Sequence, residues 1–241
     1  MRRKNSFLLQ ISTKKQMNLE IINTSDGSQT LYLPEMNEQY HSVNGAVTEA
    51  NYVYLDKGFL HNKSKKPTVF EVGFGTGLNC LLTALLAEKQ QRTTTYYSIE
   101  KYPLDKEITG QLKYGKAISP EAEILFKKIH SCEWNLAVQI SKYFKLIKLR
   151  SDLLENDLQE IAKCDVIYFD AFGPDKQPEM WQPAIFKKIY AITANDGVFV
   201  TYSAKGEVRR QLAGCGYQME RLPGPPGKFQ MLRGIKKVSV I

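Results

Sequence analysis

The chain has 241 residues, of which 43% are hydrophobic, and a net charge of +8. This length suits one large α/β domain with an appended segment and is too short for two ordinary domains. No run of about 18 apolar residues occurs, so a membrane-spanning helix is excluded, and the basic excess favours a polyanionic partner.

The N-terminal stretch from Met1 to Gln10 is predicted to be a disordered extension, because its apolar centre is too short for a secretion signal. Met17 is an alternative to Met1 as the start of the protein. The four cysteines and three histidines are scattered and form no metal-binding pair. We therefore expect free thiols, no metal site and a cytoplasmic location.

Residues 1–60 are expected to form an N-terminal extension that acts as a partial lid, followed by the main domain over residues 61–241. A small hairpin is predicted from residues 19–22 and 30–33, which flank a polar turn. A helix is predicted from about residue 46 to residue 55.

Residues 69–79 combine a buried strand, a tight turn and a helix start. Three glycines at alternate positions, Gly73 to Gly77, let the backbone approach a ligand closely, and the N–H groups of the first helical turn would face that ligand. The dinucleotide-binding fingerprint does not fit, because Leu78 stands where its last glycine belongs. An acidic residue followed by Gly-x-Gly-x-Gly resembles instead the first motif of class I S-adenosylmethionine methyltransferases. The resemblance implies these cofactor-binding residues: Glu71, Gly73, Phe74, Gly75, Thr76, Gly77 and Asn79.

Two further acidic residues follow predicted strands in the same order. Glu100 ends an apolar run about where such βαβ folds place a ribose-binding carboxylate. Asp152, with Leu153 beside it, follows the predicted strand 144–150, where this methyltransferase class commonly uses a carboxylate to accept from the adenine amino group. Either residue alone is equally consistent with a helix cap or a solvated turn.

Strand and helix patterns alternate through the main domain, which predicts a parallel sheet with helices on both faces. The predicted fold class is α/β, a Rossmann-like class I methyltransferase sheet with a small N-terminal hairpin. Strands are expected near 68–72, 95–100, 144–150, 164–170, 197–203, 216–222 and 229–235. Helices are expected near 77–90, 119–130, 134–142, 153–162, 179–193 and 205–214. The last two strands are adjacent, which predicts an antiparallel finish.

The candidate catalytic residue is Asp170, which ends an apolar strand at the edge where open α/β sheets bind ligands. Phe172 follows, and the pattern with a nearby proline resembles the Asn/Asp-Pro-Pro-aromatic loop of amino-group methyltransferases. A carboxylate can accept an N–H of the attacking amine while the ring packs against it. An alkylamine with a pKa of roughly 10 arrives protonated. Asp170 either holds that ammonium or takes its proton, and a helix cap is the structural alternative.

Four segments together resemble the MnmC methyltransferase domain and its stand-alone relative MnmD, over about residues 19–235. These are Tyr40-x-Ser42-x-x-Gly45-Ala46-x-x-Glu49-Ala50-x-Tyr52-Val53, Glu71-x-Gly73-Phe74-Gly75-Thr76-Gly77-Leu78-Asn79, Asp170-Ala171-Phe172-x-Pro174-x-Lys176-x-Pro178-x-Met180-Trp181 and Pro223-Gly224-Pro225-Pro226-Gly227-Lys228. The family uses S-adenosyl-L-methionine to methylate the aminomethyl nitrogen of 5-aminomethyl-(2-thio)uridine at the tRNA wobble position.

The resemblance places Asp170 nearest the amine and Phe172 in the substrate pocket. It also implies contact with the tRNA anticodon stem-loop through these substrate-binding residues: Ser42, Glu49, Tyr52, Lys176 and Lys228. Arg209 is a further candidate for a phosphate contact, and an exposed helix charge is its structural alternative. The link to upstream tRNA-modifying enzymes is expected to be functional only. Fused relatives carry an additional FAD-dependent oxidase domain. This chain ends at Ile241, so we expect no flavin.

One departure from the family pattern lies in the C-terminal loop. Gly-Lys is followed in the family by Arg-Glu-Met, whereas Lys228 is followed here by Phe229 and Gln230. Two alternatives to a tRNA methyltransferase remain open. One is a methyl- or aminopropyltransferase for a small amine, and the other is a non-catalytic RNA-binding protein with this fold.

Overall fold

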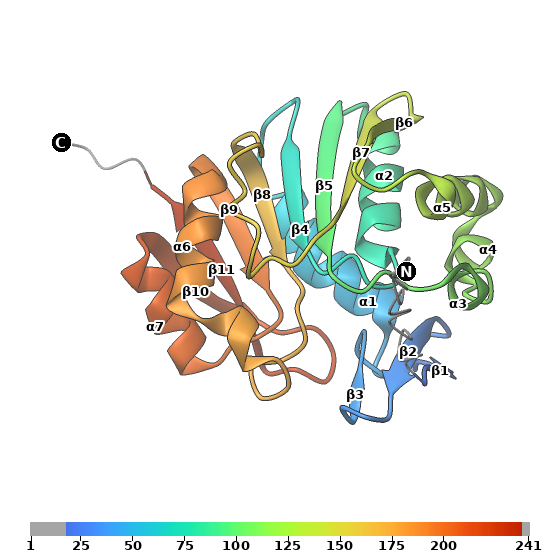
Figure 1. Ribbon diagram of the computed structural model, residues 1–241, viewed down its shortest axis with the longest axis horizontal. Helices are drawn as coiled ribbons and strands as arrows, with labels where there is room; N and C mark the ends of the chain where they lie inside the picture. The colour runs from blue at the N-terminus through green and yellow to red at the C-terminus, as the bar shows by residue number, and fades with distance from the viewer. Residues whose placement is uncertain (1–17, 238–241) are drawn as a thin grey trace, which may run out of the picture.

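The computed structural model describes residues 18–237, so the predictions for Met1 to Gln10 and for Met17 lie outside the described residues. Its centre is an eight-stranded sheet in the order β10-β11-β9-β8-β4-β5-β7-β6 (Figure 1). The strands are β4 (Thr68–Val72), β5 (Thr94–Glu100), β6 (Ala137–Ser141), β7 (Phe144–Arg150), β8 (Cys164–Phe169), β9 (Thr193–Thr201), β10 (Tyr217–Pro223) and β11 (Gln230–Lys236). The five central strands are parallel, and β10 and β11 finish the sheet antiparallel, as the sequence predicted.

Helices cover both faces of this sheet, which gives three layers. The helices are α2 (Leu78–Gln90), α3 (Lys106–Thr109), α4 (Tyr114–Ile118), α5 (Pro120–Ser131), α6 (Pro183–Ile192) and α7 (Gly206–Gly214). Side chains of β4 contribute in turn to two apolar cores, because successive side chains of a strand point to opposite faces of the sheet. Val69 packs into the core that includes α2 and α5, and Phe70 packs into the core that includes α6 and α7.

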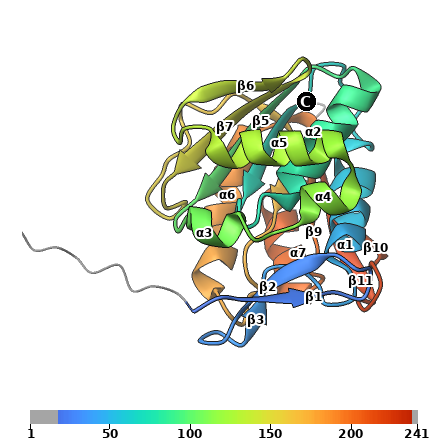
Figure 2. The ribbon, with the colours of Figure 1, turned by 90° about the vertical axis from the view of Figure 1, so that its right-hand side faces the viewer.

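The N-terminal unit forms a second, smaller antiparallel sheet of β1 (Glu20–Asn23), β2 (Gln29–Leu33) and β3 (Glu38–Gln39). The predicted hairpin is confirmed, and β3 extends it. Asp26 in its turn accepts hydrogen bonds from the Ser28 and Thr48 N–H groups, at 3.0 and 2.8 Å, which joins the hairpin to α1 (Ala46–Ala50). Figures 1 and 2 both place the small sheet at the lower end of the central sheet. The division of the chain at residue 60 stays a prediction.

The helix predicted near 46–55 is longer and changes type along its length. After α1 the chain continues as a π-helix, η1 (Asn51–Phe59), in which the Leu60 N–H donates to the Leu55 carbonyl at 2.8 Å. Gly58 lets η1 lie close to the sheet, since a Cβ there would meet Val200 at 3.0 Å. π-helical segments are rare and frequently occur at functional sites.

The helix predicted for residues 134–142 is wrong, because β6 occupies this segment and pairs antiparallel with β7. The β-branched Val138 and Ile140 are less exposed than their neighbours Ala137 and Gln139. That two-residue period belongs to a strand, and the short apolar run did not distinguish the two structures.

The helix predicted for residues 153–162 is also wrong, because side chains there satisfy backbone N–H groups two residues ahead. The Oδ1 atoms accept as follows: Asp152 from Leu154, Asn156 from Leu158 and Asp157 from Gln159. Such local bonds compete with a helix.

The short helices α3 and α4 were not predicted from the sequence. The helix predicted for 179–193 is divided at Pro183 into η2 (Pro178–Trp181) and α6. The other predicted strands and helices are confirmed, with shifts at their ends.

Candidate active site

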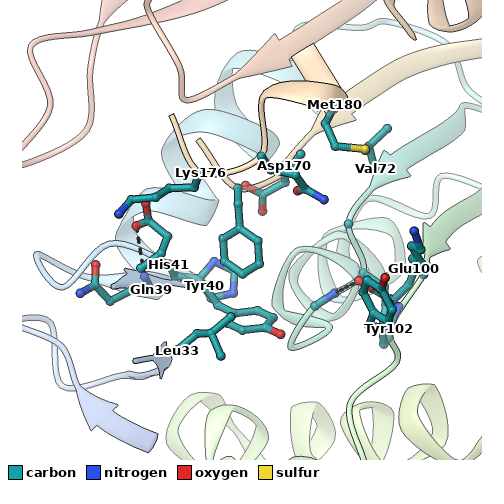
Figure 3. Close-up of a pocket in the computed structure, with 18 of the residues that line it drawn as sticks. Leu33, Gln39, Tyr40, His41, Val72, Glu100, Tyr102, Asp170, Lys176 and Met180 are labelled. Atoms are coloured by element: carbon teal, nitrogen blue, oxygen red, sulfur yellow. Dashed lines mark hydrogen bonds between the residues drawn. The ribbon is translucent and has the colours of Figure 1, made fainter. Parts of the chain in front are cut away.

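A cavity of about 460 Å³ opens at the carboxyl ends of β4, β5, β7 and β8, between the central sheet and the N-terminal unit. Figure 3 shows Asp170 and Glu100 on opposite sides of it, with Tyr40 on a third side. Its wall contains most of the sequence-predicted site residues: Ser42, Glu49, Gly73, Phe74, Gly75, Glu100, Asp152, Leu153, Asp170, Phe172, Lys176 and Lys228.

The glycine turn packs directly against the loop that carries Asp170. Gly73 has a φ of 87°, and a Cβ at this position would lie 2.8 Å from the Asp170 carbonyl oxygen. The Asp170 N–H donates to the Val72 carbonyl at 3.0 Å. The turn and the candidate catalytic residue are therefore held together through the backbone.

Glu100 ties the turn to the end of β5. Its carboxylate accepts from the Gly75 N–H at 3.1 Å and from the Tyr102 N–H at 2.8 Å. Burial raises the pKa of Glu100, although these backbone donors oppose the shift. A carboxylate has about four acceptor sites, so Glu100 retains acceptor capacity beyond these two bonds.

Asp152 stands on the next strand end and forms an ion pair with Lys101 at 2.6 Å. Burial opposes ionisation of Asp152, but Lys101 and the Leu154 N–H outweigh it and hold the pKa below the usual value. Asp152 is consequently a stable carboxylate with an exposed cation beside it.

Asp170 follows β8, and both of its carboxyl oxygens accept hydrogen bonds from side chains. Tyr54 of η1 donates to Oδ1, and the Asn79 amide of α2 donates to Oδ2 at 2.8 Å. Burial and the nearby charge of Glu49 raise the pKa of Asp170 to about 7, against the effect of its two donors. The two donors fix the carboxyl plane, and the remaining acceptor capacity is available to a ligand in the cavity.

Glu49 and Lys228 close one side of the cavity with an ion pair between distant segments. The other Glu49 oxygen accepts from the Ser42 N–H at 2.8 Å. The Lys228 ammonium lies 3.9 Å from the centroid of the Tyr202 ring, a cation–π arrangement. The Tyr52 hydroxyl donates to the Pro223 carbonyl at 3.0 Å. The N-terminal unit and the loop after β10 are therefore joined over the site.

Lys176 makes a similar connection from the loop after β8. Its ammonium donates to the Met36 carbonyl at 2.8 Å, in the turn between β2 and β3. Phe172, in the same loop, meets the Tyr40 ring edge-on at 5.1 Å between centroids. Four separate contacts, made by Glu49, Tyr52, Met36 and Tyr40, thus hold the N-terminal unit against the cavity mouth.

Six predicted residues do not line the cavity: Glu71, Thr76, Gly77, Asn79, Tyr52 and Arg209. Thr76 lies beneath the turn, where its hydroxyl and carbonyl bond the His41 and His130 rings at 2.7 and 3.1 Å. Burial lowers the pKa of both histidines to about 4, so both rings are neutral near pH 7. Arg209 lies in α7, which contacts α6, β10 and β11.

Tyr54, Tyr40, His41 and Tyr202 belong to the site and were not assigned roles from the sequence. The first three stand in the polar and aromatic stretch 40–55, and Tyr40 also opens the first of the four segments that carry the family resemblance. Nothing local marks Tyr54, because its partner Asp170 lies 116 residues away in the chain.

A family model described as S-adenosyl-L-methionine-dependent methyltransferase matches residues 121–237, a segment that includes Asp152, Asp170 and Lys228. Two similar proteins are named tRNA 5-methylaminomethyl-2-thiouridine biosynthesis bifunctional protein MnmC. The chain is 31% identical over 225 residues to the one from Burkholderia vietnamiensis and 32% identical over 219 residues to the one from Cupriavidus necator. These alignments cover 85% and 83% of this chain but 33% and 32% of the relatives, so the chain spans about a third of their length.

The fold is also similar to a solved structure, that of MnmC2 from Aquifex aeolicus. The TM-score is 0.79 at 25% sequence identity, and the match covers 94% of this chain and 73% of that one. Among the described residues, no helix is long and apolar enough to cross a membrane.

Proposed function

Because the chain belongs to the S-adenosyl-L-methionine-dependent methyltransferases and is related to the MnmC proteins, we propose a specific reaction for it. The methyl group of S-adenosyl-L-methionine is transferred to the aminomethyl nitrogen of 5-aminomethyl-(2-thio)uridine at the tRNA wobble position. The observation that carries this proposal is the Asp170 carboxyl, which faces the same cavity as the glycine turn. The names of the relatives and the net charge of +8 support a tRNA substrate.

The cavity wall fits the cofactor at several points. Positive φ angles at Gly73 and Gly75 leave backbone where a side chain would fill space. We propose that the turn from Gly73 to Gly75 holds the amino acid part, that Glu100 accepts from the ribose hydroxyls, and that Asp152 with Leu153 holds the adenine. When bound, S-adenosyl-L-methionine supplies an electrophilic methyl group.

The protein's own contribution is to hold the attacking amine. Asp170, aligned by Tyr54 and Asn79, accepts an N–H of the substrate so that the nitrogen is directed into the cavity. The pKa of Asp170 is about 7, roughly three units below an alkylammonium, so removing that proton would be uphill by about 4 kcal/mol. We therefore propose that Asp170 orients the amine and that Phe172, packed on Tyr40, forms a wall of the substrate pocket.

Activity should depend on pH through two protons, one on Asp170 and one on the amine. Below the Asp170 pKa of about 7, both must leave before reaction, so log kcat/KM should rise with a slope of about 2. Between that pKa and about pH 8, only the amine still requires deprotonation, and the slope should fall to about 1. A rate profile over pH 5 to 9 with Asp170→Asn as control checks this. A wild-type slope of about 1 throughout would remove ionised Asp170 from the mechanism.

The function itself is tested with labelled S-adenosyl-L-methionine and tRNA that carries aminomethyl uridine, followed by digestion and nucleoside mass spectrometry. We expect a gain of one methyl group on that nucleoside and a KM for tRNA that rises steeply with salt, because phosphate contacts release counterions. Transfer of an aminopropyl group, or activity on free amines alone, would favour the small-amine alternative. Cofactor binding without transfer to any RNA would favour a binding role.

A further inference from the structure

A second carboxyl, that of Glu71, lies behind Asp170. Glu71 is in β4, is 0% exposed and does not line the cavity. The Ser98 hydroxyl donates to its Oε2 at 2.6 Å, while Oε1 has no hydrogen-bond partner among residues 18–237. An ionised carboxylate that is fully buried and has one oxygen without a partner is costly, so this group requires an explanation.

The Asn79 side chain links the two carboxyls. Its amide donates to Asp170 Oδ2 at 2.8 Å and also lies close enough to Glu71 to lower the pKa of that carboxyl. The other titratable groups that act on Glu71 or respond to it are Tyr96 of β5, Tyr168 of β8 and Cys80 of α2. Burial raises the pKa of all three, so none is charged near pH 7. None of them can balance a second negative charge.

The groups that act on Glu71 include no cation. Two neighbouring carboxyls of this kind cannot both ionise readily, and one retains a proton. Asp170 has the better environment for a charge, because it accepts from two donors and feels Lys228. Glu71 accepts from the Ser98 hydroxyl, with the Asn79 and Tyr96 side chains also near it, and it does not line the cavity. Burial raises the pKa of Glu71 to about 8, and that of Asp170 to about 7, which gives the same order.

We infer that Glu71 is a positioning residue: it remains a neutral carboxylic acid beneath the glycine turn, so that Asp170, across Asn79, is the ionised member of the pair. This inference rests on the proposed function of Asp170. It assigns Glu71 a role through Asn79 and Asp170 rather than a direct contact with the cofactor. No group is oxidised or transferred, and the Glu71 proton stays where it is during turnover.

The test compares Glu71→Gln, which is neutral and keeps a donor, with Glu71→Met, which is neutral and has none. We expect Glu71→Met to lower kcat by about tenfold or more, and Glu71→Gln to restore it to within about threefold of wild type. In wild type, log kcat/KM should stop rising above about pH 8, as Glu71 ionises, whereas the Glu71→Gln profile should continue upward. Equal kcat values for the two variants, or identical profiles of wild type and Glu71→Gln, would overturn the inference.

Two readouts do not require turnover, so they separate this inference from the proposed function. The infrared difference spectrum between wild type and Glu71→Gln should contain the carbonyl stretch of a protonated carboxyl at pH 7. Glu88→Gln is the matched control. Glu88 lies near the C-terminal end of α2, far along the helix from Asn79, and accepts hydrogen bonds from Ser141 and Tyr143. Calorimetry should give Glu71→Gln a cofactor Kd within about threefold of wild type. A missing carboxyl band, or a Kd raised tenfold, would make Glu71 an ionised cofactor ligand instead.

Discussion

Replacing Asp170 by asparagine should reduce kcat by about 10²-fold or more, while the Kd for S-adenosyl-L-methionine stays near the wild-type value. The amide keeps the shape of the carboxyl, but it has no charge and one acceptor oxygen instead of two. Tyr54 and Asn79 both donate to this side chain, so the remaining oxygen is taken by one of them. Little acceptor capacity is then left for the substrate N–H.

Single-turnover kinetics and calorimetry measure the two quantities separately. Asp175→Asn is the control, because Asp175 lies in the same loop, its side chain is 77% exposed, and its partner is Lys205. Wild-type kcat is expected for that variant. If Asp170→Asn turned over at the wild-type rate, Asp170 would have no part in orienting the amine.

Replacing Gly75 by valine should weaken cofactor binding by about 10²-fold or more. Gly75 has a φ of 47°, which β-branched residues rarely adopt, and a Cβ would lie 3.1 Å from the Tyr40 ring. Relief of either strain moves the Gly75 N–H away from Glu100, which accepts from it at 3.1 Å. The turn and the proposed ribose contact would therefore be lost together.

Gly27→Val is the matched control for this variant, since Gly27 has a φ of 79° and no atom within 4 Å of its Cβ position. Both variants should lose thermal stability from backbone strain, but only Gly75→Val should lose affinity in calorimetry. Normal affinity in a folded Gly75→Val protein would refute the assignment of this turn to the cofactor.

Strand ends were predictable because their signals are local. An apolar run that stops at an acidic residue marks both a strand and the end at which ligands bind. This pattern identified Glu100 and Asp170 from the sequence, and Asp152 lies just beyond its strand. The helices predicted for 134–142 and 153–162 were wrong because other interactions decided the structure of these segments. In the first, pairing with β7 decided the structure, and in the second, side-chain bonds to the backbone replaced a helix.

By itself, the sequence determined most of the order of the elements, the glycine turn and the carboxyls at the sheet edge, because these follow from neighbouring residues. Only the tertiary structure decided which groups surround Asp170. Tyr54 reaches it across 116 residues, and Glu49 meets Lys228 across 179. It also showed that Glu71, next to the turn in sequence, does not line the cavity, because its side chain is fully buried beside Ser98 of β5 and Asn79 of α2.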